Sequence, residues 1–144
     1  MPPTIQPAKT GLGGVVWSIL GQTYTPLQHS ESSMAWHAVL PPGTFVPPHS
    51  HAAQEEFVHV LSGTLDLDSG GATRRAGPGD LLVLPRQEPH GLYNRGETPV
   101  ECLFWVAPSA RLWALFTAID GVPDPAEIVR LAALHDVTFL PPPG

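Results

Sequence analysis

The chain has 144 residues, with seven lysine and arginine residues against thirteen aspartate and glutamate residues, and a formal net charge of -6. This length suits one domain rather than two. Lys9 is the only lysine, and a nucleic-acid binder needs a basic face to neutralise phosphates, so the composition argues against that class.

From the N-terminus, residues 1–12 are expected to form a loose arm. Branched and aromatic residues then predict a first strand at residues 15–20. Further strands are predicted at residues 33–40, 57–61, 64–68, 81–84 and 100–106. Turn signals rich in glycine and proline separate these segments at close intervals. Several short strands at such spacing are typical of an all-β sandwich or barrel.

The tail, residues 108–144, changes to a helical pattern, which Gly121 ends. The apolar side chains at helical spacing are Leu112, Leu115, Phe116 and Ile119. A second helix is predicted to begin after Asp124 as N-cap, with Pro125 at its first position and Glu127 placed for a capping box. Because the two helices have few basic residues, we expect them to pack on the barrel rather than to bind DNA.

The first ten residues lack the apolar core of a signal peptide, and no apolar segment approaches the roughly 18 residues that span a bilayer. We therefore expect a cytoplasmic protein with no membrane partner. Cys102 is the only cysteine, so no internal disulfide can form. It lies in an apolar strand without basic neighbours, which favours a buried structural thiol over a nucleophile.

The stretch PPHSHAAQEEF concentrates side chains that can bind a metal. In a strand, residues two apart point to the same side, so His49 and His51 should face together. If the following segment returns as the next strand, Glu56 can close on the same point. On that parity His59 faces the other way, and Glu55 is more simply a solvated loop carboxylate.

His90 follows a second apolar strand and could provide a fourth ligand. Three imidazoles and one carboxylate suit one divalent metal ion per chain, which could be Fe, Mn, Ni, Co or Zn. Four ligands leave two positions of an octahedron open. Open positions indicate chemistry or ligand capture, whereas a structural zinc site is normally closed.

These spacings resemble the cupin superfamily. Its first signature matches Gly43, His49, His51, Glu56 and Gly63, and its second matches Gly79, Pro85, His90 and Asn94. Gln87 departs from the second signature, where the family usually has a turn glycine, so the shape of that loop is open. The resemblance implies His49, His51, Glu56 and His90 as metal ligands inside a single jelly-roll β-barrel of a small, monocupin type.

The resemblance also sets the expected organisation of the chain. Residues 13–107 would form the barrel, between the N-terminal arm and the helical tail. Small single-barrel members commonly pair, so the resemblance implies a homodimer. The predicted first strand, residues 15–20, is our candidate for an exchanged element.

A small-molecule substrate or ligand is expected at the metal, and three functions remain open. The overall layout loosely resembles quercetinase-like cupins, so the first is an oxygenase acting on a phenolic, enol or diketone substrate. In that hypothesis Glu56 is a ligand and also a catalytic proton acceptor. The second is a non-redox cyclase, isomerase, lyase or dehydratase, and the third is a cupin that binds a small ligand without turnover.

Candidate pocket residues come from strand positions that could point inward. Met34 and Trp36 share one face of their strand, and Phe104 shares a face with Cys102. The alternative for both pairs is ordinary barrel core. Tyr93 could offer a polar group, and Phe45 lies in a loop that could form the mouth of the pocket. The candidate lining is therefore Phe45, Trp36, Met34, Phe104 and Tyr93.

Overall fold

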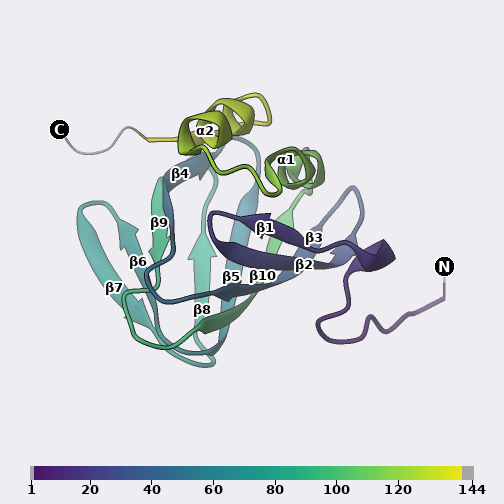
Figure 1. Ribbon diagram of the computed structural model, residues 1–144, viewed down its shortest axis with the longest axis horizontal. Helices are drawn as coiled ribbons and strands as arrows, with labels where there is room; N and C mark the ends of the chain where they lie inside the picture. The colour runs from purple at the N-terminus through teal and green to yellow at the C-terminus, as the bar shows by residue number, and fades with distance from the viewer. Residues whose placement is uncertain (1, 141–144) are drawn as a thin grey trace.

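The computed structural model describes residues 2–140, which form two antiparallel sheets packed face to face (Figure 1). The strands are β1 (Trp17–Ile19), β2 (Gln22–His29), β3 (Met34–Leu40), β4 (Phe45–His51), β5 (Glu55–Ser62), β6 (Leu65–Ser69), β7 (Ala72–Ala76), β8 (Leu81–Leu84), β9 (His90–Tyr93), β10 (Val100–Ala107) and β11 (Val137–Phe139). The larger sheet has the order β1-β2-β3-β10-β5-β8, and the smaller one has the order β11-β4-β9-β6-β7.

The core lies between the two sheets, and β10 shows how the sequence produces it. Buried and partly exposed residues alternate along this strand, so that Cys102, Phe104 and Val106 point inward. Phe104 is paired with Trp36 on β3 and with Val58 on β5, and its ring stacks on Trp36 with 5.3 Å between centroids. Burial of these apolar side chains drives the two sheets together.

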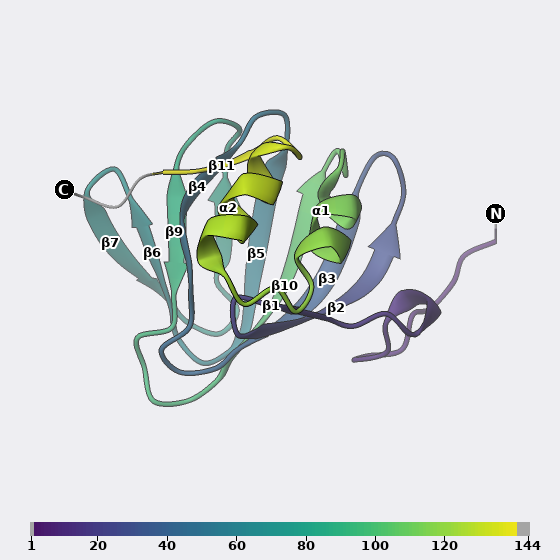
Figure 2. The same ribbon diagram turned by 45° about the horizontal axis from the view of Figure 1, so that its top comes forward.

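Two helices, α1 (Leu112–Ile119) and α2 (Pro125–Ala133), lie across one end of the sandwich, as Figure 2 shows. A short 3-10 turn, η1 (Leu12–Gly14), precedes β1. The buried face of α1 turns toward the core, where the Phe116 ring lies 5.1 Å from that of Trp36 and 5.2 Å from that of Tyr24. The helices therefore cover one end of the sandwich.

The structure confirms the predicted mostly β, jelly-roll sandwich with two C-terminal helices. Strands β2, β7, β9 and β11 were not predicted. β2 contains Pro26, where its register with β3 shifts, and β7 is a largely exposed edge strand with a polar sequence. β11 lies in the tail that the sequence predicts to be helical, and it pairs with β4.

The N-terminal end of α2 has the predicted N-cap, because the Asp124 side chain accepts a hydrogen bond from the Ala126 N–H at 3.0 Å. The capping box is not completed, since Glu127 forms an ion pair with Arg130 instead. None of the described helices has the length and apolar character needed to cross a membrane. The expected cytoplasmic location stays a prediction.

Candidate metal centre

The two histidines of β4 reach the interior because the strand contains an irregularity. Val46 pairs with Leu92, and His49 pairs with His90, but the register shifts between them at Pro47 and Pro48. Proline cannot donate a ladder hydrogen bond, which localises the irregularity there. As a result Val46 and His49 are both buried although they lie three residues apart, and His51 follows on the same side.

Glu56 on β5 and His90 on β9 complete a buried cluster with these histidines. Each of the four side chains belongs to a residue that is at most 5% exposed. Glu56 Oε2 lies 3.4 Å from His51 Nε2 and 3.8 Å from His90 Nε2. The His49 ring centroid is 4.4 Å from that of His90 and 5.1 Å from that of His51. The packing of the two sheets thus brings Glu56 against the three histidines, of which only His90 is distant in sequence.

An oxygen holds the Nδ1 atom of each cluster histidine. The contacts are His49 with Pro47 O at 2.8 Å, His51 with Gln54 Oε1 at 2.7 Å, and His90 with Glu88 O at 3.2 Å. These oxygens can only accept, so each Nδ1 must be the protonated nitrogen of its ring. In its neutral form, each imidazole then presents an Nε2 lone pair, which is the form that binds a metal.

The donor atoms of the cluster fit a cation. One donor atom from each of His49, His51, Glu56 and His90 lies within 4.8 Å of every other. Two opposite ligands with bonds of about 2.1 Å are about 4.2 Å apart, so small side-chain shifts would suffice. In the described part of the chain, His51 Nε2, His90 Nε2 and Glu56 Oε2 are buried without a hydrogen-bond partner. Such orphaned groups are rare, and a bound cation would satisfy all three.

Burial and mutual charge set the protonation of the cluster. Burial, reinforced by His90, lowers the pKa of His49 to about 3, so this imidazole is neutral. For Glu56, burial opposes ionisation, but the nearby His51 and His90 outweigh it and hold the pKa well below its usual value. Burial also disfavours the His51 cation, yet the Glu56 carboxylate outweighs that effect and raises the pKa of His51.

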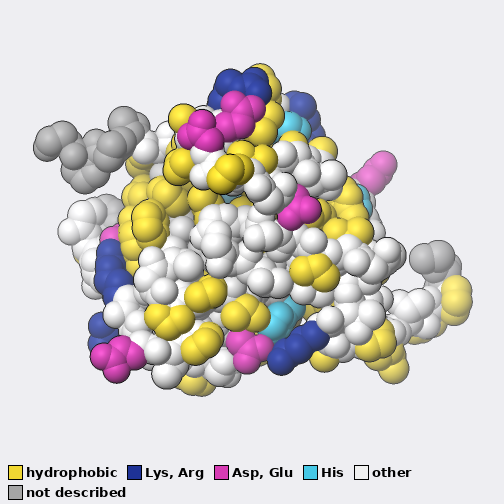
Figure 3. All heavy atoms as spheres, viewed as in Figure 1, with side chains coloured by type: hydrophobic (Ala, Val, Ile, Leu, Met, Phe, Trp, Pro, Cys, Tyr) yellow, Lys and Arg dark blue, Asp and Glu magenta, His cyan; other side chains and the backbone are white. Residues whose placement is uncertain are grey.

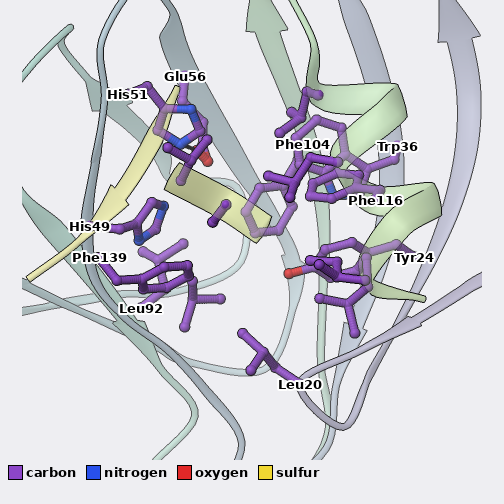
Figure 4. A pocket seen from close by; sticks show the side chains of 17 residues that line it. Leu20, Tyr24, Trp36, His49, His51, Glu56, Leu92, Phe104, Phe116 and Phe139 are labelled. Carbon is purple, nitrogen blue, oxygen red and sulfur yellow. Dashed lines mark ion pairs between the residues drawn. The ribbon is translucent and has the colours of Figure 1, made fainter. Parts of the chain in front are cut away.

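A small cavity opens beside the cluster, and Figure 4 shows how the side chains surround it. His49, His51 and Glu56 lie on one side, and an aromatic group faces them: Tyr24, Trp36, Phe104 and Phe116. The free volume is about 50 Å³. Trp36 Nε1 is buried and has no hydrogen-bond partner among the described residues. The wall opposite the cluster thus contains one unused donor.

The structure separates the five predicted pocket residues into three groups. Trp36 and Phe104 line the cavity. Met34 is fully buried in the core but does not line it. Phe45 and Tyr93 lie outside the barrel, where their rings stack with 5.3 Å between centroids. The irregularity in β4 explains why Phe45 points outward, because it turns Val46 inward and the adjacent Phe45 outward.

Several residues around the site were not predicted from the sequence. Gln54 orients His51 and is itself held by the Pro108 and Ser109 carbonyl groups at 3.0 and 2.7 Å. Tyr24 and Phe139 come from strands that were not predicted. Phe139 lies on β11, with its ring 5.3 Å from that of His49. Gln54 could have been suspected as an amide close to the ligand motif, whereas the tail strand gave no local signal.

Other polar residues lie where the sequence suggested or nearby. His59 is half-buried on the outer side of β5, away from the cluster. Gln87, at the position where the family usually has glycine, adopts a left-handed backbone with φ 65°. Its N–H donates to His51 O at 2.9 Å, so the loop keeps a glycine-like shape with a glutamine. Burial raises the pKa of the Cys102 thiol to about 12, as expected for an inert cysteine.

Comparison with known proteins agrees with this architecture. Residues 36–106 match the family model of the cupin domain. The chain is 28% identical over 96 residues to the tetracenomycin polyketide synthase protein TcmJ of Streptomyces glaucescens. The aligned region covers 66% of this chain and 64% of that protein. It is 36% identical over 93 residues to germin-like protein 5-1 of Oryza sativa subsp. japonica, covering 58% and 42% respectively.

Among solved structures, KdgF from Halomonas sp. superposes with a TM-score of 0.58 at 25% identity, covering 61% of this chain and 79% of that one. The chain spans less than two thirds of the length of the two curated relatives. The family model covers the strands that contain all four cluster residues. The chain is therefore a cupin-domain protein.

Proposed function

We propose that the protein is a metal-dependent enzyme that binds one divalent cation and acts on a small, mostly apolar phenol, enol or diketone. The observation that carries this proposal is the set of three Nε2 lone pairs and one carboxylate that converge beside an apolar cavity. His49, His51, Glu56 and His90 would hold the cation. His90 does not line the cavity, so the cation would be reached from the side of the other three.

When bound, the cation would supply Lewis acidity and, in the case of iron, redox chemistry with O2. The residues of the chain would do the rest. Glu56 is ionised and faces the cavity, so its carboxylate would accept the proton of a substrate hydroxyl. The apolar walls would exclude water. The unused Trp36 N–H would donate a hydrogen bond to an oxygen at the far end of the substrate.

The reaction we favour is an oxygenase reaction, which agrees with the loose quercetinase-like layout of the sequence. A specific observation supports a second candidate. TcmJ is a polyketide synthase protein, and polyketides are rich in the diketone and phenol groups that such a site would bind. A non-redox cyclase or related Lewis-acid enzyme is therefore the alternative. Binding without turnover is the third hypothesis.

Elemental analysis of the purified protein, combined with oxygen uptake in the presence of a catechol, a flavonol and a 1,3-diketone, tests the proposal. Iron with oxygen uptake supports the oxygenase. Substrate conversion that persists without O2 supports the Lewis-acid enzyme. A cation with no turnover of any of the three supports simple binding, and failure to take up any divalent cation contradicts the whole proposal.

Glu56→Gln tests the role of the carboxylate. We expect this variant to retain some cation but to lose turnover, because an amide cannot accept the substrate proton. Glu55→Gln is the matched control, since Glu55 is the adjacent residue on β5 and is exposed. Unchanged turnover in Glu56→Gln would remove the proton-acceptor role.

We also propose that two copies pair through the outer face of the larger sheet. A solvent-facing sheet face is normally polar, but Leu61, Leu81 and Val83 are 45%, 52% and 57% exposed here. Figure 3 shows hydrophobic side chains grouped where Figure 1 places β5 and β8. In the single chain, β1, which lies in the segment expected to be exchanged, pairs with β2. Sedimentation velocity should give a dimer that Val83→Lys weakens, and a monomer at all concentrations contradicts the pairing.

A further inference from the structure

The cavity beside the cation cluster is too small for the ligands proposed above. Its free volume is about 50 Å³, whereas pockets for small organic ligands are typically about 300–1,000 Å³. An aromatic ligand can therefore reach the cluster only after some side chains move. The inference that follows rests on the proposed function, because it assumes that such a ligand reaches the cation.

A larger groove lies just outside the barrel, between α2 and the outer side of β4 and β9. Its volume is about 470 Å³. Figure 3 shows hydrophobic side chains gathered below α2 in this region. The lining of the groove is mostly apolar, with Phe45, Pro47, Val129 and Leu140 among the apolar residues, and it also includes Tyr93 and one charged residue, Asp68. The rings of Phe45 and Tyr93 lie nearly parallel, at 14°, and the Arg95 guanidinium lies 4.1 Å from the centre of the Tyr93 ring. The ring that offers an exposed flat apolar surface is therefore Phe45, which is 46% exposed.

Leu20 and Phe139 line both the groove and the cavity, and no other described residue does so. Phe139 covers His49 from the short edge strand β11, which is held to β4 by only three residue pairs. Leu20 lies at the turn between β1 and β2, and Figure 4 shows it at the edge of the cavity. These two side chains therefore separate the outer groove from the cavity beside the cluster.

The backbone at Leu20 is strained. Ile19 and Gln22 are paired, so Leu20 and Gly21 form a two-residue turn, and both have positive φ, at 54° and 77°. This turn type strongly prefers asparagine or aspartate followed by glycine. A leucine in the left-handed region is unfavourable, because its Cβ lies too close to the following carbonyl oxygen. Strain of this kind, retained at the edge of a site, points to a function of the side chain.

We propose that the outer groove is a docking site for a flat aromatic or enolic ligand, and that Leu20 and Phe139 form the barrier that such a ligand displaces to reach the cation cluster. Continuity with the cavity through these two residues favours this occupant. A second hollow reaches His90, but it has a volume of only about 110 Å³ and is lined by Arg74 and Glu88, which do not suit an apolar ligand.

The first test uses the zinc-loaded protein and 4-nitrocatechol, whose visible spectrum changes when it chelates a metal. Stopped-flow absorbance should show association about tenfold faster in Leu20→Ala and in Phe139→Ala, since each variant lowers the barrier. Leu134→Ala is the control, because Leu134 is 54% exposed and lines neither the groove nor the cavity. Equal association rates in all four proteins would overturn the barrier.

The second test needs no cation and separates this proposal from the proposed function. Diethyl pyrocarbonate reacts with neutral imidazoles, so its rate of reaction with His49, located by mass spectrometry, reports access to the metal-free cavity. We expect faster reaction in Leu20→Ala and Phe139→Ala than in Leu134→Ala. If this holds while the protein takes up no cation, the barrier stands and the proposed function fails. Unchanged rates overturn the barrier whatever the cation content.

The variant Leu20→Gly distinguishes loss of the barrier from general destabilisation of the fold. Glycine relieves the left-handed strain and also removes the Leu20 side chain from the barrier. This variant should therefore unfold at the same or a higher urea concentration than Leu20→Ala and still admit both reagents quickly. Fast access that appears only in variants with lowered resistance to urea would contradict a specific barrier.

Discussion

Each of the three cluster histidines is oriented by an oxygen on its Nδ1 side, and Gln54 is the only side chain among these acceptors. The other two acceptors are the backbone carbonyl groups of Pro47 and Glu88, which substitution does not remove. At the scale of single residues, Gln54 is therefore the position where the orientation of a candidate metal ligand, His51, can be changed without changing His51 itself.

We predict that Gln54→Leu lowers the affinity for the cation about 10–100-fold, because the His51 ring loses its acceptor and its fixed tautomer. Gln54→Glu should retain most of the affinity, since a carboxylate still accepts from Nδ1. Both variants lose the donor to Pro108 and Ser109, so their comparison separates orientation from folding. Competition with a chromophoric chelator measures the affinities. Equal losses in the two variants would contradict the role of Gln54 as acceptor.

The pKa shifts of the cluster predict how stability of the metal-free protein depends on pH. The pKa of His49 is lowered from 6.5 to about 3 and that of Glu56 is also lowered, so the unfolded chain binds more protons in acid and stability falls as pH drops below 6.5. The pKa of His51 is raised, so its contribution is complete below pH 6.5 and is lost as pH rises through the folded value.

The metal-free protein should therefore be most stable near pH 6.5. Urea unfolding in the presence of a chelator, from pH 5 to pH 9, measures this dependence. His51→Gln should remove the loss on the alkaline side. A free energy of unfolding that still rises with pH above 7 in the unmodified chain would contradict the direction given for His51.

At the scale of elements, local signals and long-range pairing differ in how well the sequence reveals them. The buried face of α1 and the alternation in β10 were predictable, because each pattern depends on one segment only. His49 and His51 were predictable for the same reason, since their spacing lies within one strand, whereas His90 lies on β9 and was predicted from the second cupin signature. β11 was not, because three residues form a strand there only when β4 is beside them.

The outward position of Phe45 also depended on information outside the local pattern. Strict alternation from His51 would have turned it inward, but the shift at Pro47 and Pro48 reverses the sides. The sequence shows the two prolines but does not show where the neighbouring strand changes register. The identity of the cation and of the substrate is equally invisible, because five metals accept the same donor set.

The helix α2 depends on the capping of its first turn. We predict that Asp124→Ala lowers the free energy of unfolding by about 1 kcal/mol, because the Ala126 N–H loses its acceptor. Asp124→Asn is the matched variant, since its amide oxygen can still accept. Urea unfolding followed by circular dichroism measures both. A loss in Asp124→Asn as large as that in Asp124→Ala would show that the charge, and not the cap, is responsible.

At the scale of the whole molecule, the cluster joins the two sheets, since His49, His51 and His90 lie on one and Glu56 lies on the other. A cation held by all four would therefore bind the folded chain and not the unfolded one. A free concentration 100 times the dissociation constant would stabilise the fold by about 2.7 kcal/mol.

We accordingly predict that removal of the cation lowers Tm by roughly 5–10 °C for a chain of this size. Differential scanning calorimetry with and without added zinc measures the shift. His59→Ala should show the same shift, because His59 lies on the outer side of β5, whereas His90→Ala should lose most of it. A shift of equal size in both variants would place the binding site elsewhere.

The position of Cys102 has a practical consequence. This thiol is fully buried at the centre of the larger sheet and has no partner cysteine. An alkylating reagent such as iodoacetamide can react with it only during the brief moments when the sandwich comes apart. The chain therefore contains its own reporter of global unfolding. The rate at which Cys102 is labelled would follow the folding equilibrium, even in a mixture of proteins and without a fluorescent dye.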